Sequence, residues 1–362
     1  MAKFKEFLKR KDIILSGKRY GIDALGAMAQ GLFCTLLVGT ILNTLGQMGI
    51  EFLNQTVVTI KQGENAISYT IGGLASAMVG PGIAVAIGIA LNAPGMVLFS
   101  LIPVGFAANA MGGAGGPLAV YFVAIVASEC GKLVSKETKV DILVTPIVTI
   151  LAGVGISALI AAPIGAAASA VGDFVEWATV LQPFLMGILV SVVVGIALTL
   201  PISSAAICAA LGLTGLAGGA AVAGCCAQMV GFAVMSFREN RWGGLVAQGI
   251  GTSMLQMPNI IKNPLIWIPP TLASAITGPL ATCLFKLEMN GAPVSSGMGT
   301  CGLVGQIGIY TGWVATGHTI TAFDWIGLVL ICFVLPAVLT WLISLPLRKW
   351  GWIGENDLKL DL

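Results

Sequence analysis

Ten long apolar runs, separated by short polar segments, dominate this sequence. They cover Ala24–Leu45, Ile71–Leu91, Met96–Ala110, Pro117–Cys130, Ile142–Ala162, Phe184–Pro201, Ala205–Phe237, Leu245–Ile261, Leu265–Leu287 and Trp325–Leu347. A helix needs about 20 apolar residues to cross the hydrocarbon core of a bilayer. Only 9% of the residues are charged, against roughly 25% in soluble domains, so lipid must replace water around most of the surface. The runs predict an all-α integral membrane protein with about 8–10 transmembrane helices, some of them re-entrant.

Basic residues gather at both ends of the chain and in two loops. Cytoplasmic segments are enriched in Lys and Arg, so both termini are predicted to be cytoplasmic. Residues 1–23 are predicted to form a basic amphipathic segment on the inner membrane surface, with a disordered basic tail as the alternative. Residues 24–349 then form a single transmembrane domain, and 350–362 a short cytoplasmic tail. Loops 132–139 and 238–241 can both be cytoplasmic only if at least one apolar run is a half-span.

An internal repeat is the most informative pattern in the chain. Leu74–Pro81 reads LASAMVGP and Leu272–Pro279 reads LASAITGP, with six of eight positions identical at an offset of 198 (272 − 74). The same offset carries Asn92 onto Asn290, and each asparagine is followed within three residues by Ala-Pro. Recurrence of small apolar residues by composition alone is the alternative, but the shared Asn and Pro positions favour two related segments, 72–117 and 270–315.

A second, weaker match joins Leu36–Leu45 (LLVGTILNTL) to Val192–Leu200 (VVVGIALTL) at an offset near 156 (192 − 36). The two offsets disagree, so either the connecting loops differ in length or this match is coincidental. Paired repeats are common in transporters, which bind solute where discontinuous helices of both halves meet near the midplane.

Two glycine-rich stretches follow the repeated motifs, Gly105–Gly116 (GFAANAMGGAGG) and Gly291–Gly308 (GAPVSSGMGTCGLVGQIG). Irregular backbone at membrane depth survives only where protein or a water-filled cavity satisfies its polar groups. Both stretches are therefore predicted to be re-entrant segments whose exposed N–H and C=O groups can bind a polar solute.

The segment Glu288–Ile307 (EMNGAPVSSGMGTCGLVGQI), with its partner Leu91–Gly95 (LNAPG), resembles the membrane subunits IIC of the bacterial sugar phosphotransferase system. The closest resemblance is to the type 2 subgroup that includes the perfringolysin regulator of clostridia, and it covers nearly the whole chain. It implies a homodimer in a bacterial cell membrane that carries a sugar inward. The tails are too short for a phosphoryl-carrying domain, so separate soluble phosphocarrier subunits would have to supply any phosphorylation.

Polar side chains in or near the glycine-rich stretches are the candidate solute ligands. Amides and hydroxyls both donate and accept hydrogen bonds, as sugar hydroxyls do, and a carboxylate forms the stronger, charge-assisted kind. The candidates are Asn92, Asn109, Glu288, Asn290, Ser295, Ser296, Gln306 and His318, the chain's one histidine. Capping of broken helices is the alternative for the asparagines, and a loop or interfacial position for Glu288 and His318.

No catalytic motif is present: H-E-x-x-H, GxxxxGK[ST] and G-x-S-x-G are all missing. The eight cysteines include no C-x-x-C pair and lie mostly in apolar runs, where a thiol packs as a small apolar side chain. No metal site and no cofactor are expected. Whether the chain is an enzyme is uncertain; at most it is the translocation subunit of a sugar phosphotransferase.

The predicted function is alternating-access transport of a small polar solute, favoured as a sugar by the family resemblance. Two alternatives stay open: a membrane-embedded ligand sensor that regulates gene expression, and a carrier of another metabolite without phosphorylation. The predicted partners are the solute, the lipid bilayer, a second copy of the chain and separate phosphocarriers. The net charge of +2 gives no reason to expect a nucleic acid.

Overall fold

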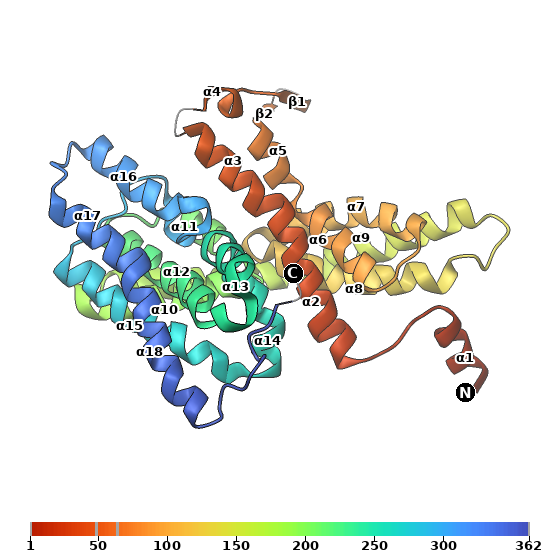
Figure 1. The fold of residues 1–362 in the computed structure, drawn as a ribbon. Helices are drawn as coiled ribbons and strands as arrows, with labels where there is room; N and C mark the ends of the chain where they lie inside the picture. The colour runs from red at the N-terminus through yellow and green to blue at the C-terminus, as the bar shows by residue number, and fades with distance from the viewer. Residues whose placement is uncertain (1, 48–49, 63–64, 361–362) are drawn as a thin grey trace. The chain divides into compact units, whose positions relative to one another are not determined.

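The computed structural model describes residues 2–47, 50–62 and 65–360. They form two compact units (Figure 1). Unit 1 comprises Met1–Gly39 and Gly73–Ala167, and unit 2 comprises Thr40–Gly72 and Ala168–Leu362. The two copies of the repeated motif therefore fall in different units.

Among its described residues, unit 1 is made of helices joined by short turns and loops, with no strand. It contains α1 (Ala2–Arg10), η1 (Arg19–Asp23), α2 (Ala24–Leu32), η2 (Phe33–Leu37), α6 (Val79–Ala90), α7 (Gly95–Gly112), η3 (Gly113–Gly115) and α8 (Gly116–Val134), and it shares α3 (Val38–Gln47), α5 (Ile71–Ala77) and α9 (Asp141–Thr179) with unit 2. The π-helical segments η1 and η2 continue α2 and α3 in one long helix.

Glycines let the helices of unit 1 approach backbone to backbone. A Cβ at Gly80 on α6 would overlap the carbonyl oxygen of Gly105 on α7, and one at Gly31 on α2 would lie 2.6 Å from the carbonyl oxygen of Gly82. Small residues allow this close packing between membrane helices, where lipid supplies no hydrophobic driving force. The glycine at 105 is therefore a packing position within a regular helix.

The first glycine-rich stretch thus differs from the prediction of a re-entrant segment. Its residues up to Gly112 are helical, and only Gly113, with φ +51°, leaves the right-handed region. The chain reverses there, and α7 and α8 pack side by side. Next to this reversal, Gly115 packs against the carbonyl of Ile164 on α9.

Unit 2 is built around one buried helix, α12 (Gly215–Met235). The other helical elements of this unit are α4 (Glu51–Asn54), α10 (Pro183–Thr199), α11 (Ser204–Ala210), α13 (Phe237–Val246), η4 (Ala247–Gly251), η5 (Ser253–Gln256), α14 (Met257–Lys262), η6 (Pro264–Trp267), α15 (Ile268–Pro279), η7 (Leu280–Leu284), η8 (Pro293–Gly297), η9 (Cys301–Leu303), α16 (Val304–Thr316), α17 (Ala322–Val329), η10 (Leu330–Val334) and α18 (Leu335–Lys349). The apolar window of α12 is 94% buried, because α10, α15 and α18 pack around it (Figure 1).

The two named strands in the described part of unit 2 form one short hairpin. Strands β1 (Val58–Gln62) and β2 (Asn65–Tyr69) pair antiparallel, with Val58 opposite Tyr69 and Ile60 opposite Ile67.

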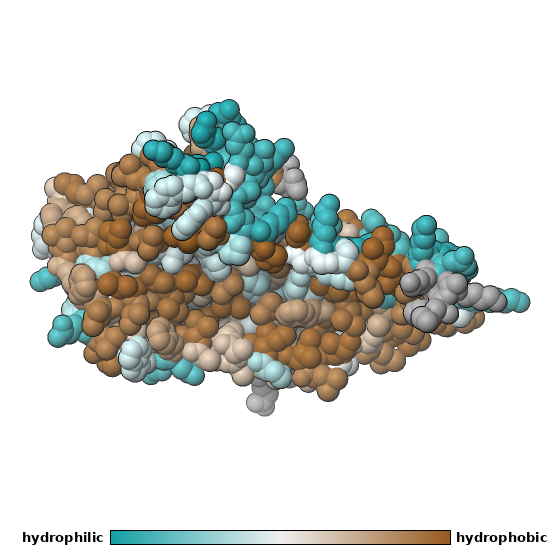
Figure 2. Space-filling view, turned by 90° about the horizontal axis from the view of Figure 1, so that it is seen from below, coloured by the Kyte–Doolittle hydropathy of each residue, from teal (hydrophilic) through white to brown (hydrophobic). Residues whose placement is uncertain are grey.

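Five helices in the described part of the chain are long and apolar enough to cross a membrane: Arg19–Gly46, Gly95–Val134, Asp141–Thr179, Gly215–Met235 and Ala322–Lys349. The pair α5 and α6, bent by 54°, makes a sixth, and α10 is a shorter apolar helix. Figure 2 shows hydrophobic residues over most of the visible surface, with hydrophilic ones in patches. These features confirm an all-α membrane protein. The count is lower than 8–10 partly because α7 and α8 are joined in one 40-residue stretch, and because π and 3₁₀ turns shorten several other runs.

The two sequence matches have a common packing in the two units. In unit 1 the long helix that leads into the weaker match lies against α6, the helix in which the repeated motif ends, through Gly31 and Gly82, which lie just outside the matched residues. In unit 2 the corresponding helices, α10 and α15, meet through Gly187 and Gly278. The residues after the motif diverge, because α7 follows in unit 1 and a series of 3₁₀ turns in unit 2. The duplication stays a prediction that this shared packing supports.

Candidate functional site

In each unit, a polar region follows the repeated motif. In unit 2 this region is residues 287–306, called the Asn290 segment below. Met289 pairs with Gly215, the first residue of α12, through two backbone hydrogen bonds of 3.0 Å. The Thr300 hydroxyl lies 3.5 Å from the Met229 sulfur, 14 residues further along α12 (229 − 215), or about 21 Å at 1.5 Å per residue.

The chain then returns toward its starting level. Gly302 has φ +51° and Leu303 φ +60°, and after this turn α16 runs back until Gly312 packs on Asn290, where a Cβ would lie 2.7 Å from the asparagine's carbonyl carbon. The Asn290 segment and α16 therefore enter the core of unit 2 beside α12 and leave it at the same end.

Glu288 and Asn290 lie together at the mouth of this segment. The Asn290 amide donates to the Glu288 carboxylate at 2.9 Å and accepts from the Gly215 N–H at 3.1 Å. Glu288 is exposed, so its carboxylate keeps acceptor capacity for another donor. The amide also helps to fix the first turn of α12, which agrees with the alternative role of capping.

The two serines of the segment have different surroundings. The Ser296 hydroxyl donates to the Leu213 carbonyl at 2.7 Å, and Ser204 on α11 donates to the Gly297 carbonyl at 2.7 Å. These bonds satisfy backbone carbonyls in irregular parts of the chain, outside the regular hydrogen bonding of α-helices and strands. Ser295 is also buried, 6% exposed, and its side chain packs against Gly308.

Gln306 is also buried, 7% exposed, and lies beside the middle of α12. Its Nε2 lies 3.2 Å from the Cys226 sulfur on α12, and its Oε1 is buried without a partner among the described residues. An unsatisfied buried acceptor costs about 1–3 kcal/mol. A donor from a bound solute would relieve that cost.

His318 lies in the loop between α16 and α17, and its side chain is 46% exposed. Its Nε2 is 3.2 Å from Asp324, whose carboxylate also accepts from the Thr321 N–H in a capping box at the start of α17. The ring lies beside Trp313. This position favours the loop interpretation of His318 over solute binding.

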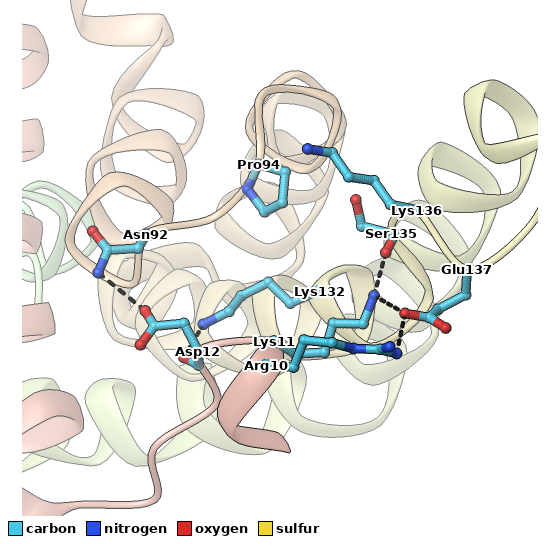
Figure 3. Close-up of a pocket in the computed structure, with 9 residues that line it drawn as sticks. All are labelled: Arg10, Lys11, Asp12, Asn92, Pro94, Lys132, Ser135, Lys136 and Glu137. Atoms are coloured by element: carbon cyan, nitrogen blue, oxygen red, sulfur yellow. Dashed lines mark hydrogen bonds and ion pairs between the residues drawn. The ribbon is translucent and has the colours of Figure 1, made fainter. Parts of the chain in front are cut away.

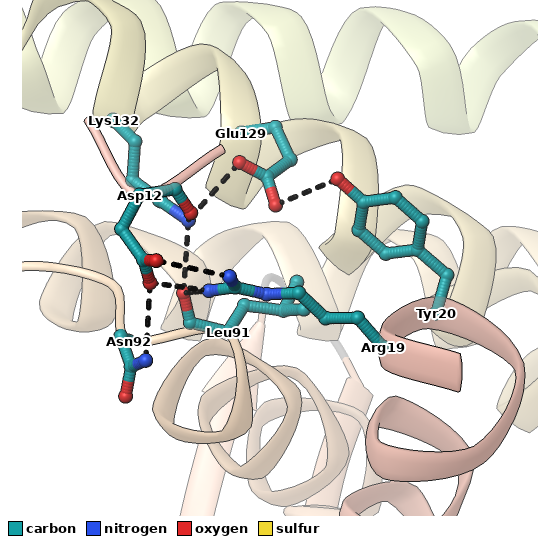
Figure 4. Close-up of polar contacts among 7 residues, drawn as sticks. All are labelled: Asp12, Arg19, Tyr20, Leu91, Asn92, Glu129 and Lys132. Atoms are coloured by element: carbon teal, nitrogen blue, oxygen red, sulfur yellow. Dashed lines mark hydrogen bonds and ion pairs between the residues drawn. The ribbon is translucent and has the colours of Figure 1, made fainter. Parts of the chain in front are cut away.

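In unit 1 the break after α6 is occupied by the protein's own side chains (Figure 4). Asn92 has φ +55° and ends α6, which leaves the Leu91 carbonyl free for other donors. Arg19 donates to this carbonyl at 2.6 Å and Lys132 at 2.9 Å. Two cations at a helix C-terminus stabilise the negative end of its dipole. The Asn92 amide itself donates to Asp12 at 3.0 Å.

A second layer of polar contacts surrounds these residues. Lys132, whose side chain is 2% exposed, forms an ion pair with Glu129 at 3.1 Å, and the Tyr20 hydroxyl donates to Glu129 at 3.0 Å (Figure 4). We call the region formed by Asp12, Arg19, Glu129 and Lys132 the charged end of unit 1. Sequence reasoning missed it as a unit, although Glu129 and Lys132 lie at the end of an apolar run and Arg19 lies five residues before another.

Asn109 is not part of this region. It lies near the opposite end of α7, packed against Gly80 and Gly116, and 17 residues separate it from Asn92 (109 − 92). At 1.5 Å per residue this corresponds to about 25 Å, so no single small solute can contact both asparagines.

The charged end predicts how stability depends on pH. Hydrogen bonds from Arg19 lower the pKa of Asp12 to about 2, below the usual value near 4. Because the folded pKa is the lower one, the stabilising contribution is present above about pH 4 and is lost as the pH falls toward about 2. In thermal unfolding of the detergent-solubilised protein, Asp12→Asn should be less stable than wild type at neutral pH, and this difference should shrink below about pH 4. Exposed Asp173→Asn is the control, and a difference that grows on acidification would contradict the prediction.

A cavity of about 400 Å³ opens at the charged end (Figure 3). Arg10 forms an ion pair with Glu137 at 2.7 Å, and Lys11 contacts both Glu137 and the Ser135 carbonyl. The nearby Lys11 ammonium lowers the pKa of Glu137. These contacts hold the N-terminal segment against the loop after α8.

Comparison with known proteins gave one match. A family model described as "Phosphotransferase system, EIIC" matches residues 22–360. The matched range includes both copies of the motif, Glu129 and Lys132 of the charged end, and the Asn290 segment. No curated protein and no solved structure matches the chain.

Proposed function

Because the chain belongs to the phosphotransferase system EIIC family, we propose that it carries a sugar across a bacterial cell membrane and that the Asn290 segment binds this sugar. At the family level, EIIC proteins are membrane subunits of sugar transport that work with soluble phosphotransferase partners. The type 2 subgroup that includes the perfringolysin regulator remains the expected placement, and the partner subunits would carry out any phosphorylation.

One observation carries the assignment of the site. The Asn290 segment reaches deep along α12 with hydroxyls and an amide buried among apolar helices, and Gln306 Oε1 there has no partner among the described residues. Glu288 and Asn290 at the mouth offer a carboxylate and an amide to an arriving sugar. Ser295 and Ser296 lie between the mouth and Gln306. Asn92, Asn109 and His318 are less favoured, since each has a structural role or lies apart from the segment.

The direction of entry follows from the basic residues of each unit. In unit 1, Lys11 contacts Ser135 and Glu137, so the N-terminus and the basic loop 132–139 lie at one end. In unit 2, Asn240 binds the backbone of Leu358, so the loop 238–241 lies with the C-terminal tail. The positive-inside rule assigns both ends to the cytoplasm.

This assignment gives a consistent route for the chain. The long helix through α2 and α3, the bent pair α5 and α6, and α7, α8, α9, α12, α15 and the α17–α18 helix each cross once. The Asn290 segment with α16, and α10 with α11, are half-spans. Because Gly215 begins α12 at the end opposite to the cytoplasmic Arg238–Arg241, the mouth at Glu288 and Asn290 faces outward, as uptake requires. Alternating access would then need movement around this segment, and a homodimer is the proposed assembly.

Replacement of the mouth residues tests the proposal. The purified protein in proteoliposomes should accumulate at least one sugar from a panel of labelled hexoses, hexitols and disaccharides. Glu288→Gln and Asn290→Ala should each weaken binding of that sugar about tenfold, because each removes a strong hydrogen-bond partner. Thermal-shift titration measures the affinity.

Glu355→Gln, an exposed carboxylate in the C-terminal tail, is the matched control and should bind as wild type does. Unchanged affinity in both mouth variants would move the site elsewhere. A protein that binds sugar but never accumulates it would favour the sensor alternative and end the transport proposal.

A further inference from the structure

The cavity at the charged end lies entirely within unit 1. Its walls come from the N-terminal segment, the start of α7 and the loop after α8, and its lining residues are Arg10, Lys11, Asp12, Asn92, Pro94, Lys132, Ser135, Lys136 and Glu137. Four of these carry positive charge and two carry negative charge. The Asn290 segment of unit 2 contributes no residue to it.

Both carboxylates of the cavity are already neutralised. Glu137 is paired with Arg10 and Lys11, and Asp12 is paired with Arg19 at 2.6 Å. The buried Lys132 is held by the Leu91 and Asp12 carbonyls and by Glu129. Lys136 is different, because its ammonium has no ion-pair or hydrogen-bond partner among the described residues. Among its lining residues the cavity therefore holds a surplus of positive charge, and the nearby Asp141 carboxylate, which accepts from the Lys136 backbone N–H at 2.7 Å, offsets part of it.

Several hydrogen-bond donors point into the same part of the cavity without a partner. Ser135 is only 5% exposed, and in the described chain nothing bonds to its hydroxyl. The 18-residue helix α7 begins here without a side-chain cap, and the N–H groups of Gly95 and Met96 in its first turn are unpaired among the residues described. Figure 3 shows the Ser135 hydroxyl and the Lys136 ammonium directed toward the side where Pro94 leads into α7.

An N-terminal helix turn, a hydroxyl and an ammonium are the donors that proteins use for a tetrahedral oxyanion. The helix N-terminus carries about half a positive charge and presents N–H groups, and charge-assisted bonds from lysine strengthen the binding. A neutral sugar would leave the surplus charge uncompensated. We propose that this cavity binds a phosphate group, held by Lys136, Ser135 and the first turn of α7.

Two kinds of molecule could bring such a group to this end of unit 1: a soluble phosphate ester, such as a phosphorylated sugar, or the headgroup of an anionic phospholipid. The first source rests on the proposed sugar transport, whereas the site itself rests on the geometry of unit 1 alone. Sugar accumulation and phosphate binding are measured separately, so one proposal can fail without the other.

Equilibrium dialysis of the full-length detergent-solubilised protein with radiolabelled orthophosphate and with radiolabelled glucose-6-phosphate tests the first source. Native mass spectrometry with phosphatidylglycerol against phosphatidylcholine tests the second. Lys136→Gln and Ser135→Ala should each weaken binding of the preferred probe about tenfold, and added salt should weaken binding to wild type. Lys139→Gln, an exposed lysine of the same loop, is the matched control.

Selective binding of either soluble probe, lost in Lys136→Gln and retained in Lys139→Gln, supports the site with a soluble ester as its source. The same pattern with phosphatidylglycerol alone supports the site with a lipid headgroup as its source. Binding of none of the probes, or binding that Lys136→Gln and Lys139→Gln reduce equally, would overturn the proposal. Because the side chains of Lys136 and Ser135 line the cavity and have no partner among the described residues, thermal unfolding of both variants should stay close to wild type.

Discussion

The substitution Gly219→Ala on α12 is expected to push the Asn290 segment away from this helix. A Cβ there would overlap the carbonyl oxygen of Leu287 and lie 2.9 Å from its carbonyl carbon, and both atoms are backbone that no rotamer change can move. Overpacking of a core typically costs about 1–3 kcal/mol, and a backbone clash belongs at or above the upper end. The free energy of unfolding should fall by about 3 kcal/mol or more, and sugar binding should be lost with it.

Alanine substitutions at two other glycines are expected to have smaller effects and serve as comparisons. A Cβ at Gly218 would lie 2.9 Å from the Ser296 hydroxyl oxygen, which can turn away, so Gly218→Ala should destabilise the protein less. Gly155 on α9 has open space around it, and alanine there should be neutral or stabilising by about 0.5–1 kcal/mol. Denaturant unfolding in detergent measures all three variants. Equal stability of Gly219→Ala and Gly155→Ala would contradict the packing of the segment on α12.

Hydropathy predicted the membrane helices because the thickness of a bilayer sets a length that apolar runs must meet. It could not predict what each glycine does. Gly105 lies in a glycine-rich stretch, yet it packs inside a regular helix. Gly299 and Gly302 lie in the other glycine-rich stretch, and their positive φ angles interrupt the helical conformation. Both uses depend on the neighbouring backbone, and that neighbour is distant in the sequence.

The candidate site shows the same limit. Glu288, Asn290, Ser296 and Gln306 are close in sequence, so a local motif could place them in one segment. The contacts of Asn92 instead come from Asp12, which is 80 residues away, and no periodicity or spacing links the two. For this reason the sequence predicted Asn92 as a solute ligand, whereas in the structure its amide donates a hydrogen bond to Asp12 of the N-terminal segment.

Loss of the Lys132 ammonium is expected to have the largest effect of any change at the charged end. Its donors satisfy the carbonyls of Leu91 and Asp12 at 2.9 and 2.7 Å, and it is the cation nearest to Glu129. Removing one member of a buried ion pair costs about 3–5 kcal/mol, because the remaining charge stays buried without compensation. Lys132→Met, which keeps the length and apolar stem of the side chain, should therefore lower the free energy of unfolding by about this amount.

A second substitution separates the charge from the packing. Glu129→Gln removes the uncompensated carboxylate but can still accept the hydrogen bond of Tyr20, so the double variant should be more stable than the sum of the two single losses predicts. Lys139→Met, on the exposed part of the same loop, is the control and should stay within about 0.5 kcal/mol of wild type. If the two single losses simply add in the double variant, Lys132 and Glu129 do not stabilise one another, and the carbonyls of Leu91 and Asp12 alone account for the buried ammonium.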